Sequence, residues 1–172
     1  MHLPMPKQRP KGPKAVDVVI DTNVLVHAKN PAVWSHDDAK SFLVALLAGQ
    51  AKWCMDEGFS WNEADNQSFI YSEYRRKLIP TDLGLSVLAK LARTRRVAIA
   101  PKCSRDVRDR IRALVPANPV DCRFAQTAAE SQSGMLVSHD VQDFPDRVRA
   151  AMRGDRELRV DILHAFEAAP FV

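Results

Sequence analysis

Acidic residues follow two short apolar runs of the sequence, at the point where each run ends. The run 18–20 precedes Asp21, and the run 135–137 precedes Ser138, His139 and Asp140. Runs of this kind are typical of strands buried on both faces of a parallel sheet. A carboxylate at the end of such a strand is costly to bury alone, so it either has a partner or coordinates a ligand. In open parallel sheets, ligands bind at this end of the strands.

Two further acids stand where expected helices begin or face the core. Asn118 and Pro119 predict a helix start, which places Asp121 in the first turn, where the helix dipole favours a carboxylate. Glu73 lies beside the apolar row of a helix expected over residues 69–78. A glutamate in that position is uncommon unless it is paired or binds an ion.

Each of the four acids also has a simpler interpretation. Asp21, with Thr22 and Asn23, could cap a helix, and Asp121 could serve only as a helix-dipole contact. Asp140 could form a turn, and Glu73 could form an ion pair with Arg76 or Lys77. The set is more informative than its members, because in a doubly wound sheet all four positions can converge on one edge. Four carboxylates in one pocket repel each other and bind protons more tightly unless a cation is present.

The chemistry of such a set is that of a hard divalent cation. Oxygen ligands suit Mg²⁺ or Mn²⁺ rather than zinc, which prefers nitrogen and sulfur. A site of this type can activate a water molecule and stabilise charge during phosphodiester cleavage.

The elements that must position these residues alternate between strands and helices. Strands are expected around residues 18–20, 52–56, 97–100 and 135–137, with an edge strand over 158–160; the first is expected to continue over 24–28. Helices are expected over residues 35–48, 69–78, 81–91, 104–115, 118–133, 144–152 and 161–168. This alternation predicts an α/β fold, a three-layer α/β/α sandwich with a central parallel sheet.

The composition is that of a globular protein, with 172 residues of which 46% are hydrophobic and 27% charged. One domain over residues 15–172 is expected, after a basic, proline-rich tail over residues 1–14 that is expected to be disordered. No apolar run reaches membrane-spanning length, and residues 1–14 are not expected to act as a secretory signal, because they contain no hydrophobic segment. Three widely spaced cysteines form no zinc pattern and indicate a reducing, cytoplasmic setting.

The formal net charge of +4 is concentrated in one segment. Residues 93–112 contain eight basic and two acidic residues, a net charge of +6, which leaves −2 for the rest of the chain. Within this segment Arg105, Arg108 and Arg112 share a helix face. The face is a candidate contact for a nucleic-acid backbone, and its alternative is an ordinary solvated helix surface.

The acids in their sequence contexts resemble the PIN-domain family of nucleases, over about residues 16–172. The resemblance rests on four motifs, which are Val18-Val19-Ile20-Asp21-Thr22-Asn23, Ser72-Glu73-Tyr74, Val120-Asp121-Cys122-Arg123-Phe124-Ala125 and Leu136-Val137-Ser138-His139-Asp140. It implies a PIN-like α/β/α sandwich and a metal-dependent endoribonuclease that hydrolyses RNA phosphodiester bonds with Mg²⁺ or Mn²⁺. In-line attack on phosphorus should leave a 5′-phosphate and a 3′-hydroxyl.

The resemblance assigns roles by position. The implied catalytic and metal-binding acids are Asp21, Glu73, Asp121 and Asp140, with Asp143 as an auxiliary metal ligand. The residues implied to shape the site by hydrogen bonding are Thr22, Asn23 and Ser138. The arginines expected to guide the RNA substrate are Arg75, Arg76, Arg105, Arg108 and Arg112.

Several alternatives stay open at this point. The segment from Asp56 to Glu73 is longer than in compact members of the family, so Glu57 or Glu63 could supply the second acid. Many small bacterial members are toxins of type II toxin–antitoxin pairs, so an antitoxin partner and a homodimer are expected. The other candidate functions are a non-catalytic PIN-like nucleic-acid-binding or regulatory module and an aspartyl-phosphate phosphotransferase; Asn23 argues against the latter because a second aspartate is usual there.

Overall fold

A parallel sheet of five strands lies at the centre of the computed structural model, which describes residues 15–115 and 118–172. The strands are β1 (Asp17–Ile20), β2 (Lys52–Met55), β3 (Val97–Ile99), β4 (Met135–Val137) and β5 (Asp161–Leu163). They are hydrogen-bonded in the order β3-β2-β1-β4-β5, and every pair is parallel. The predicted parallel α/β fold is confirmed, whereas the tail predicted over residues 1–14 lies outside the described residues.

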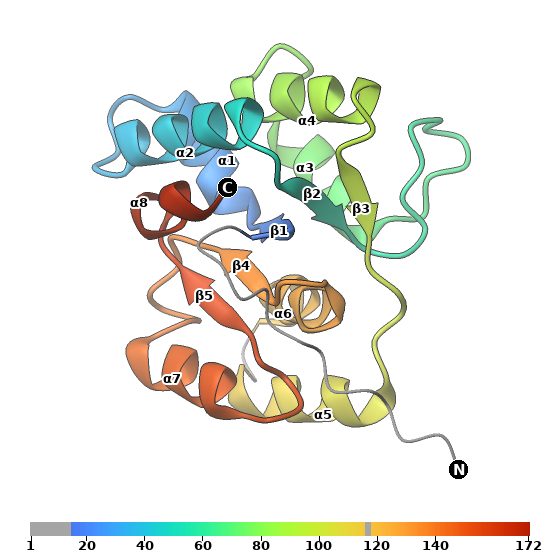
Figure 1. Cartoon of the computed structure of the whole chain (residues 1–172), viewed down its shortest axis with the longest axis vertical. Coiled ribbons are helices and arrows are strands. Elements are labelled where there is room, and N and C mark those ends of the chain that lie inside the picture. Colours follow the sequence, from blue (N-terminus) through green and yellow to red (C-terminus); the bar gives the residue numbers. More distant parts are fainter. Residues whose placement is uncertain (1–14, 116–117) are drawn as a thin grey trace.

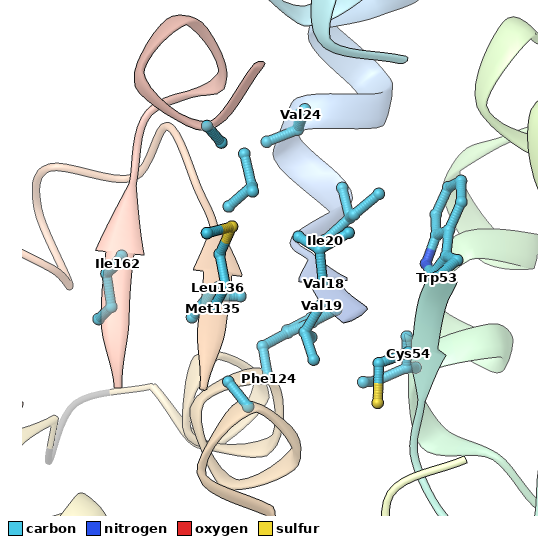
Figure 2. Packing of buried hydrophobic residues seen from close by; sticks show 14 of the residues in the cluster. Val18, Val19, Ile20, Val24, Trp53, Cys54, Phe124, Met135, Leu136 and Ile162 are labelled. Atoms are coloured by element: carbon cyan, nitrogen blue, oxygen red, sulfur yellow. The ribbon is translucent and has the colours of Figure 1, made fainter. Parts of the chain in front are cut away.

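Strand β1 lies in the middle of the sheet because it is apolar on both faces. Val18, Val19 and Ile20 are completely buried, as a central parallel strand requires. Figure 2 shows them between Trp53 of β2 and Leu136 of β4. Burying each of these side chains contributes about 1.5–3 kcal/mol of transfer free energy, so the strand that ends at Asp21 is firmly anchored.

Helices cover both faces of the sheet (Figure 1). One layer contains α1 (Thr22–Lys29), α2 (His36–Ala48), α4 (Leu83–Arg93), α8 (Ala165–Ala168) and the 3₁₀ helix η1 (Ala169–Phe171). The other contains α5 (Arg105–Leu114), α6 (Pro119–Glu130) and α7 (Asp146–Gly154). Helix α3 (Phe69–Lys77) contacts both α1 and α6, so it connects the two layers at an edge of the sheet. In the described part of the chain, no helix has the length and apolar character needed to cross a membrane.

Helices α3, α5 and α6 each begin where a polar side chain accepts backbone N–H groups of the first turn. Ser68 caps α3, Ser104 caps α5 and Asn118 caps α6. The last two starts were predicted from the sequence and are confirmed, because a cap and its first turn are local interactions. Ser35 also precedes its predicted helix, but its side chain makes no capping hydrogen bond.

The predictions were wrong in two regions, residues 24–28 and residues 158–168. Residues 22–29 form helix α1 and not a continuation of β1, because Asp21 caps them and Val24, Leu25 and Ala28 all bury on one side of a helix. The edge strand is β5 at Asp161–Leu163, three residues after the predicted 158–160, and only Ala165–Ala168 of the expected last helix is α-helical. In both cases packing against the sheet overrides local propensity.

The order of the strands places a reversal next to β1. The chain proceeds from β1 to β2 and β3 in one direction, then returns to place β4 and β5 on the other side of β1. Open parallel sheets bind ligands outside the carboxyl ends of the strands at such a switch point. Here that point lies between the ends of β1 and β4, which are followed by Asp21 and Ser138.

Candidate metal centre

Asp21 is held between the end of β1 and the start of α1. Its Oδ1 accepts the backbone N–H of Asn23 at 3.3 Å, which makes it the N-cap of α1. Its Oδ2 accepts hydrogen bonds from the Asn23 side-chain amide at 2.8 Å and from the Ser138 hydroxyl at 2.7 Å. The same hydroxyl accepts the backbone N–H of Asp140 at 3.1 Å. Asn23 and Ser138 therefore fix the carboxylate and connect the ends of β1 and β4.

The surroundings of Asp21 favour its neutral form at the expense of its charged form. Burial raises the pKa of Asp21 from 3.8 to about 6, against the lowering effect of hydrogen bonds from Ser138 and Asn23, and the charge of Asp140 raises it further. Thr22, the third residue expected to shape the site, has a buried hydroxyl without a hydrogen-bond partner among the described residues.

Asp121 is placed by the first turn of α6. The Asn118 side chain accepts the N–H groups of Val120 at 3.0 Å and of Asp121 at 3.3 Å. Burial raises the pKa of Asp121 to about 8, and the charge of Asp21 and a hydrogen bond with Asp143 raise it in addition. Asp121 is buried, and its Oδ2 has no hydrogen-bond partner among the described residues.

Asp140 and Asp143 come from the loop that follows β4. Asp140 Oδ1 accepts the backbone N–H groups of Gln142 and Asp143, each at 2.8 Å, so the turn considered from the sequence is present. Asp143 Oδ2 accepts a hydrogen bond from the Asn118 side-chain amide at 2.8 Å. Asn118 therefore connects the start of α6 to this loop and holds Asp121 close to Asp143.

Three of these acids form a compact group of oxygen ligands. One carboxylate oxygen from each of Asp121, Asp140 and Asp143 lies within 4.8 Å of the others. Asp21 is not in this tight group. Its charge nevertheless raises the pKa of Asp121, and the charge of Asp140 raises the pKa of Asp21. Within residues 15–115 and 118–172, no basic side chain forms a salt bridge with any of the four.

The structure does not bring Glu73 into this group. Glu73 is buried on α3, and its Oε2 pairs with the Arg76 guanidinium at 3.2 Å, which is the intrahelical ion pair considered as its alternative. The neighbouring Tyr74 hydroxyl donates to the carbonyl of Ile20, immediately before Asp21. Helix α3 is therefore fixed to the end of β1, with Glu73 one residue away from that contact.

The two substitutes considered for Glu73 also lie outside the group. Glu57 is within 3.9 Å of Arg123, and Glu63 pairs with Arg75 at 3.1 Å. The buried acid that ends β2 is Asp56, whose carboxylate accepts hydrogen bonds from the Ser68 hydroxyl and from the Phe69 backbone at the start of α3. It serves as a structural cap, although the sequence shows the same pattern of an acid after a buried strand.

The arginines expected to guide RNA fall into two places. Arg105 and Arg112 are exposed on α5, and both lie within 4.0 Å of Asp109. Arg108 is half-buried on the same helix, and its Nε has no hydrogen-bond partner among the described residues. Arg75 and Arg76 are on α3, each paired with a glutamate.

Sequence reasoning missed Arg149 of α7, which forms hydrogen bonds with the loop that carries Asp140 and Asp143. Its guanidinium donates to the carbonyls of Phe144 at 2.7 Å, Ile162 at 3.0 Å and Asp140 at 3.1 Å. It therefore ties β5 to the loop that carries Asp140 and Asp143. No spacing in the sequence indicated this contact, because the bonds run to backbone carbonyls.

Sequence reasoning also missed a group of histidines. The Nδ1 atoms of His27 and His139 lie 2.9 Å apart, and the His164 ring stacks on His139 with centroids 6.1 Å apart. Burial lowers the pKa of His139 to about 4 and also lowers the pKa of the other two. These rings are neutral at pH 7 and provide no counter-charge for the aspartates.

The donor set fits a hard divalent cation on three grounds. All candidate ligands are carboxylate oxygens, which Mg²⁺ and Mn²⁺ prefer. Asp121 has a buried oxygen without a hydrogen-bond partner among the described residues. Burial above all, with a smaller effect of neighbouring aspartates, raises the pKa values of Asp21 and Asp121, and no positive charge in the described part of the chain lowers them. In comparisons with known proteins, no family model matches the chain and no curated protein is significantly similar to it.

Proposed function

We propose that this protein is a metal-dependent endoribonuclease that hydrolyses RNA phosphodiester bonds. The observation that supports this most directly is the meeting of Asp21, Asp121, Asp140 and Asp143 at the switch point of the sheet, with no basic partner among the described residues. Groups of like charge can lie close together when a bound ligand of opposite charge compensates their repulsion. The resemblance of the motifs around these acids to PIN-domain nucleases supports the reaction type.

In this proposal Asp121, Asp140 and Asp143 would hold Mg²⁺ or Mn²⁺, and Asp21 lies near enough for its charge to act on Asp121. The cation would supply charge neutralisation and a lowered pKa of bound water. Asn23 and Ser138 keep the Asp21 carboxylate in one orientation through their hydrogen bonds. Water attacks phosphorus, the bond from phosphorus to the 3′ oxygen breaks, and that oxygen leaves with a proton as a hydroxyl.

The proposal does not assign the cation to Glu73. Its side chain is 8% exposed and pairs with Arg76, whose side chain is 68% exposed. Removing Arg76 would leave a buried carboxylate without a partner, which is costly, so the pair stabilises α3 in this proposal.

The histidine group favours metal-dependent hydrolysis over attack by the ribose hydroxyl. An imidazole pair that acts on the ribose must reach the substrate with its ring nitrogens. His139 is 6% exposed, its Nε2 accepts the Ala165 N–H at 3.3 Å, and its Nδ1 faces His27. The His27 ring is in turn bonded to Ser35 at 2.6 Å.

The test is cleavage of an end-labelled single-stranded RNA by the full chain, first freed of metal with EDTA. We expect no cleavage without metal, cleavage on addition of Mn²⁺ or Mg²⁺, and products with a 5′-phosphate and a 3′-hydroxyl. Products that end in a 2′,3′-cyclic phosphate, or cleavage that persists in EDTA, would contradict the proposal. The same assay on DNA measures whether the ribose is required.

The non-catalytic nucleic-acid-binding module predicts a different result. In that case the chain binds RNA but does not cleave it with any divalent cation. The antitoxin partner and the homodimer stay predictions from the resemblance.

A further inference from the structure

The segment between β2 and α3 contains two aromatic residues, Phe59 and Trp61, together with acidic residues and no basic one, and the nearby arginines belong to α3. Figure 1 shows this segment as a loop that projects from the sheet beside β3. It is the part of the chain that is longer than the resemblance predicts. We propose that it is a binding site for an unpaired base of a single-stranded RNA substrate, with Trp61 as the stacking surface and Arg75 at the phosphate. This rests on the proposed function, whose substrate it specifies.

The loop over residues 58–67 is closed by its own hydrogen bonds. The N–H of Gln67 donates to the carbonyl of Gly58 at 2.8 Å, and Gly58 has a φ of +85°, which favours glycine. Inside the loop, the Asn66 side chain accepts the Ser60 N–H at 3.1 Å, and the Asn62 amide donates to Asp65 at 2.6 Å. A loop ordered before binding loses less conformational entropy when a ligand arrives.

Two aromatic rings, those of Phe59 and Tyr71, fix the position of Trp61 on this loop. Phe59 meets the Trp61 ring at 4.9 Å between centroids and the Tyr71 ring at 5.3 Å, both in T-shaped contacts. Trp61 and Tyr71 are themselves 6.3 Å apart in a T-shaped contact. Tyr71 is buried, whereas Trp61 is 46% exposed. The indole is thus held by two rings while nearly half of its surface stays open to a ligand.

A groove lies beside Tyr71, the ring that contacts Trp61, and its lining is polar and contains two arginines and one glutamate. It has a volume of about 390 Å³ and is lined by Glu63, Asn66, Tyr71, Ser72, Arg75 and Arg76. This volume is within the range of small-ligand sites, roughly 300–1,000 Å³. An aromatic surface beside two arginines matches the chemistry of single-stranded nucleic acid, in which flat bases alternate with phosphates.

The arginines of the groove are held by interactions that a phosphate can replace. Arg75 pairs with Glu63 at 3.1 Å, and the two side chains are 37% and 66% exposed. An ion pair this exposed contributes little net stability, so Arg75 can exchange Glu63 for a phosphate oxygen. Arg76 pairs with Glu73, which precedes Tyr74, the residue of α3 that donates a hydrogen bond to the end of β1.

The groove and the acidic centre share one support. Tyr71 and Arg75 come from α3, and Tyr74 of the same helix donates a hydrogen bond to Ile20, which precedes Asp21. A strand whose base stacks on Trp61 therefore runs along α3 toward the end of β1. Paired bases are not available for such stacking, so this site selects single strands. It is sequence-tolerant, because every base has a face that can stack.

The test measures binding without cleavage, on the full chain with Asp21→Asn in EDTA, by fluorescence polarisation of a labelled single-stranded RNA. Trp61→Ala should weaken binding about 5- to 100-fold, the range for loss of one stacked base. Trp61→Phe keeps an aromatic ring and should weaken RNA binding much less. Trp34→Ala removes an indole that is 74% exposed on the α1–α2 loop and should leave binding unchanged. Arg75→Ala should lower the slope of log affinity against log salt by about one.

A second measurement observes the indole directly. Trp53 is fully buried, so in a Trp34→Phe variant Trp61 is the exposed tryptophan, and single-stranded RNA should quench its fluorescence. Unchanged binding in Trp61→Ala, or equal loss for a duplex of the same sequence, would overturn the base site. Binding that depends on Trp61 in a chain that never cleaves RNA would instead overturn the proposed activity. Tight binding of an uncharged aromatic peptide, insensitive to salt, would mean that the groove recognises protein.

Discussion

At the scale of single residues, Asp21 and Asp121 have the environments that differ most from that of a solvated carboxylate among the four acids. Both are buried next to other aspartates, and their pKa values are raised to about 6 and about 8. Charge that the protein does not compensate costs stability unless a ligand binds, and perturbed groups of this kind concentrate at functional sites. Substituting Asp21 tests its part in RNA cleavage, and substituting Asp121 tests how much its burial lowers the stability of the metal-free protein.

Asp21→Asn should reduce RNA cleavage by at least about 100-fold while the fold is kept. The asparagine retains an oxygen for capping α1 but lacks the charge that the proposed activity needs. The measurement is the single-turnover cleavage rate, with circular dichroism as the check on folding. Asp37→Asn, an exposed acid on α2, is the matched control and should cleave at the wild-type rate. Equal rates for both variants would remove Asp21 from the reaction.

Asp121→Asn should stabilise the metal-free protein at high pH. With a pKa of about 8 in the folded state and about 3.8 when unfolded, the folded protein holds a proton that the unfolded chain releases between these values. The free energy of unfolding of the wild type therefore falls as pH rises from about 4 to about 8. Asparagine does not ionise, so the free energy of unfolding of Asp121→Asn should exceed that of the wild type by roughly 1–3 kcal/mol at pH 8 and by little at pH 4.

Urea denaturation in EDTA at pH 4.5, 6 and 8 measures this difference. Asp106→Asn, which removes an exposed acid on α5, is the control and should leave the pH dependence as it is in the wild type. Parallel curves for wild type and Asp121→Asn would mean that Asp121 is ionised at little cost, and the argument for uncompensated charge would fail.

At the scale of the elements, helix α3 depends on an acid outside the proposed centre. Asp56 ends β2 and accepts hydrogen bonds from the first turn of α3, at 2.8 Å for the Phe69 N–H. Helix α3 in turn carries Glu73, Tyr74 and the arginines of the groove. The orientation of this helix therefore links the cap, the acidic centre and the aromatic loop.

Asp56→Ala should destabilise the protein by about 1–3 kcal/mol, because it removes a cap and leaves buried donors without acceptors. Asp56→Asn keeps one acceptor and should lose less. Urea denaturation measures both, and RNA binding under native conditions should fall in Asp56→Ala as α3 loosens. A stability loss in Asp56→Asn as large as in Asp56→Ala would assign the effect to the charge and not to the cap.

At the scale of the whole molecule, the sheet brings together segments that are more than one hundred residues apart. Asp21 and Ser138 are joined by a 2.7 Å hydrogen bond across the β1–β4 pair. A cation that binds this junction binds only the folded chain. Its affinity is therefore measurable as thermal stability.

Saturating Mn²⁺ should raise the melting temperature by about 5–10 °C. At one hundred times the dissociation constant a ligand adds about 2.7 kcal/mol, and each kcal/mol raises the melting temperature of a chain of this size by about 2–4 °C. The rise should be larger at pH 8 than at pH 5, because protons compete with the metal. Asp121→Asn should reduce the rise by more than half; the same rise in wild type and variant would place the metal elsewhere.

The sequence by itself determined what depends on neighbouring residues. The apolar runs that end in Asp21 and before Ser138, and the caps Ser104 and Asn118, are all found where they were predicted. The alternation of these elements was enough to predict a parallel α/β sheet, because buried strands and amphipathic helices have different periods. The position of an acid at the end of a strand follows from the same local pattern.

The tertiary structure decided what depends on which strands become neighbours. The pairing of β4 with β1 is a non-local interaction, and it brings Asp140 close to Asp21 and Asp121. Glu73 instead pairs with Arg76 within its own helix. The contacts of Arg149 and of the paired histidines arise in the same way. A local pattern specifies a residue's burial and direction, but strand pairing alone specifies which side chains share a pocket.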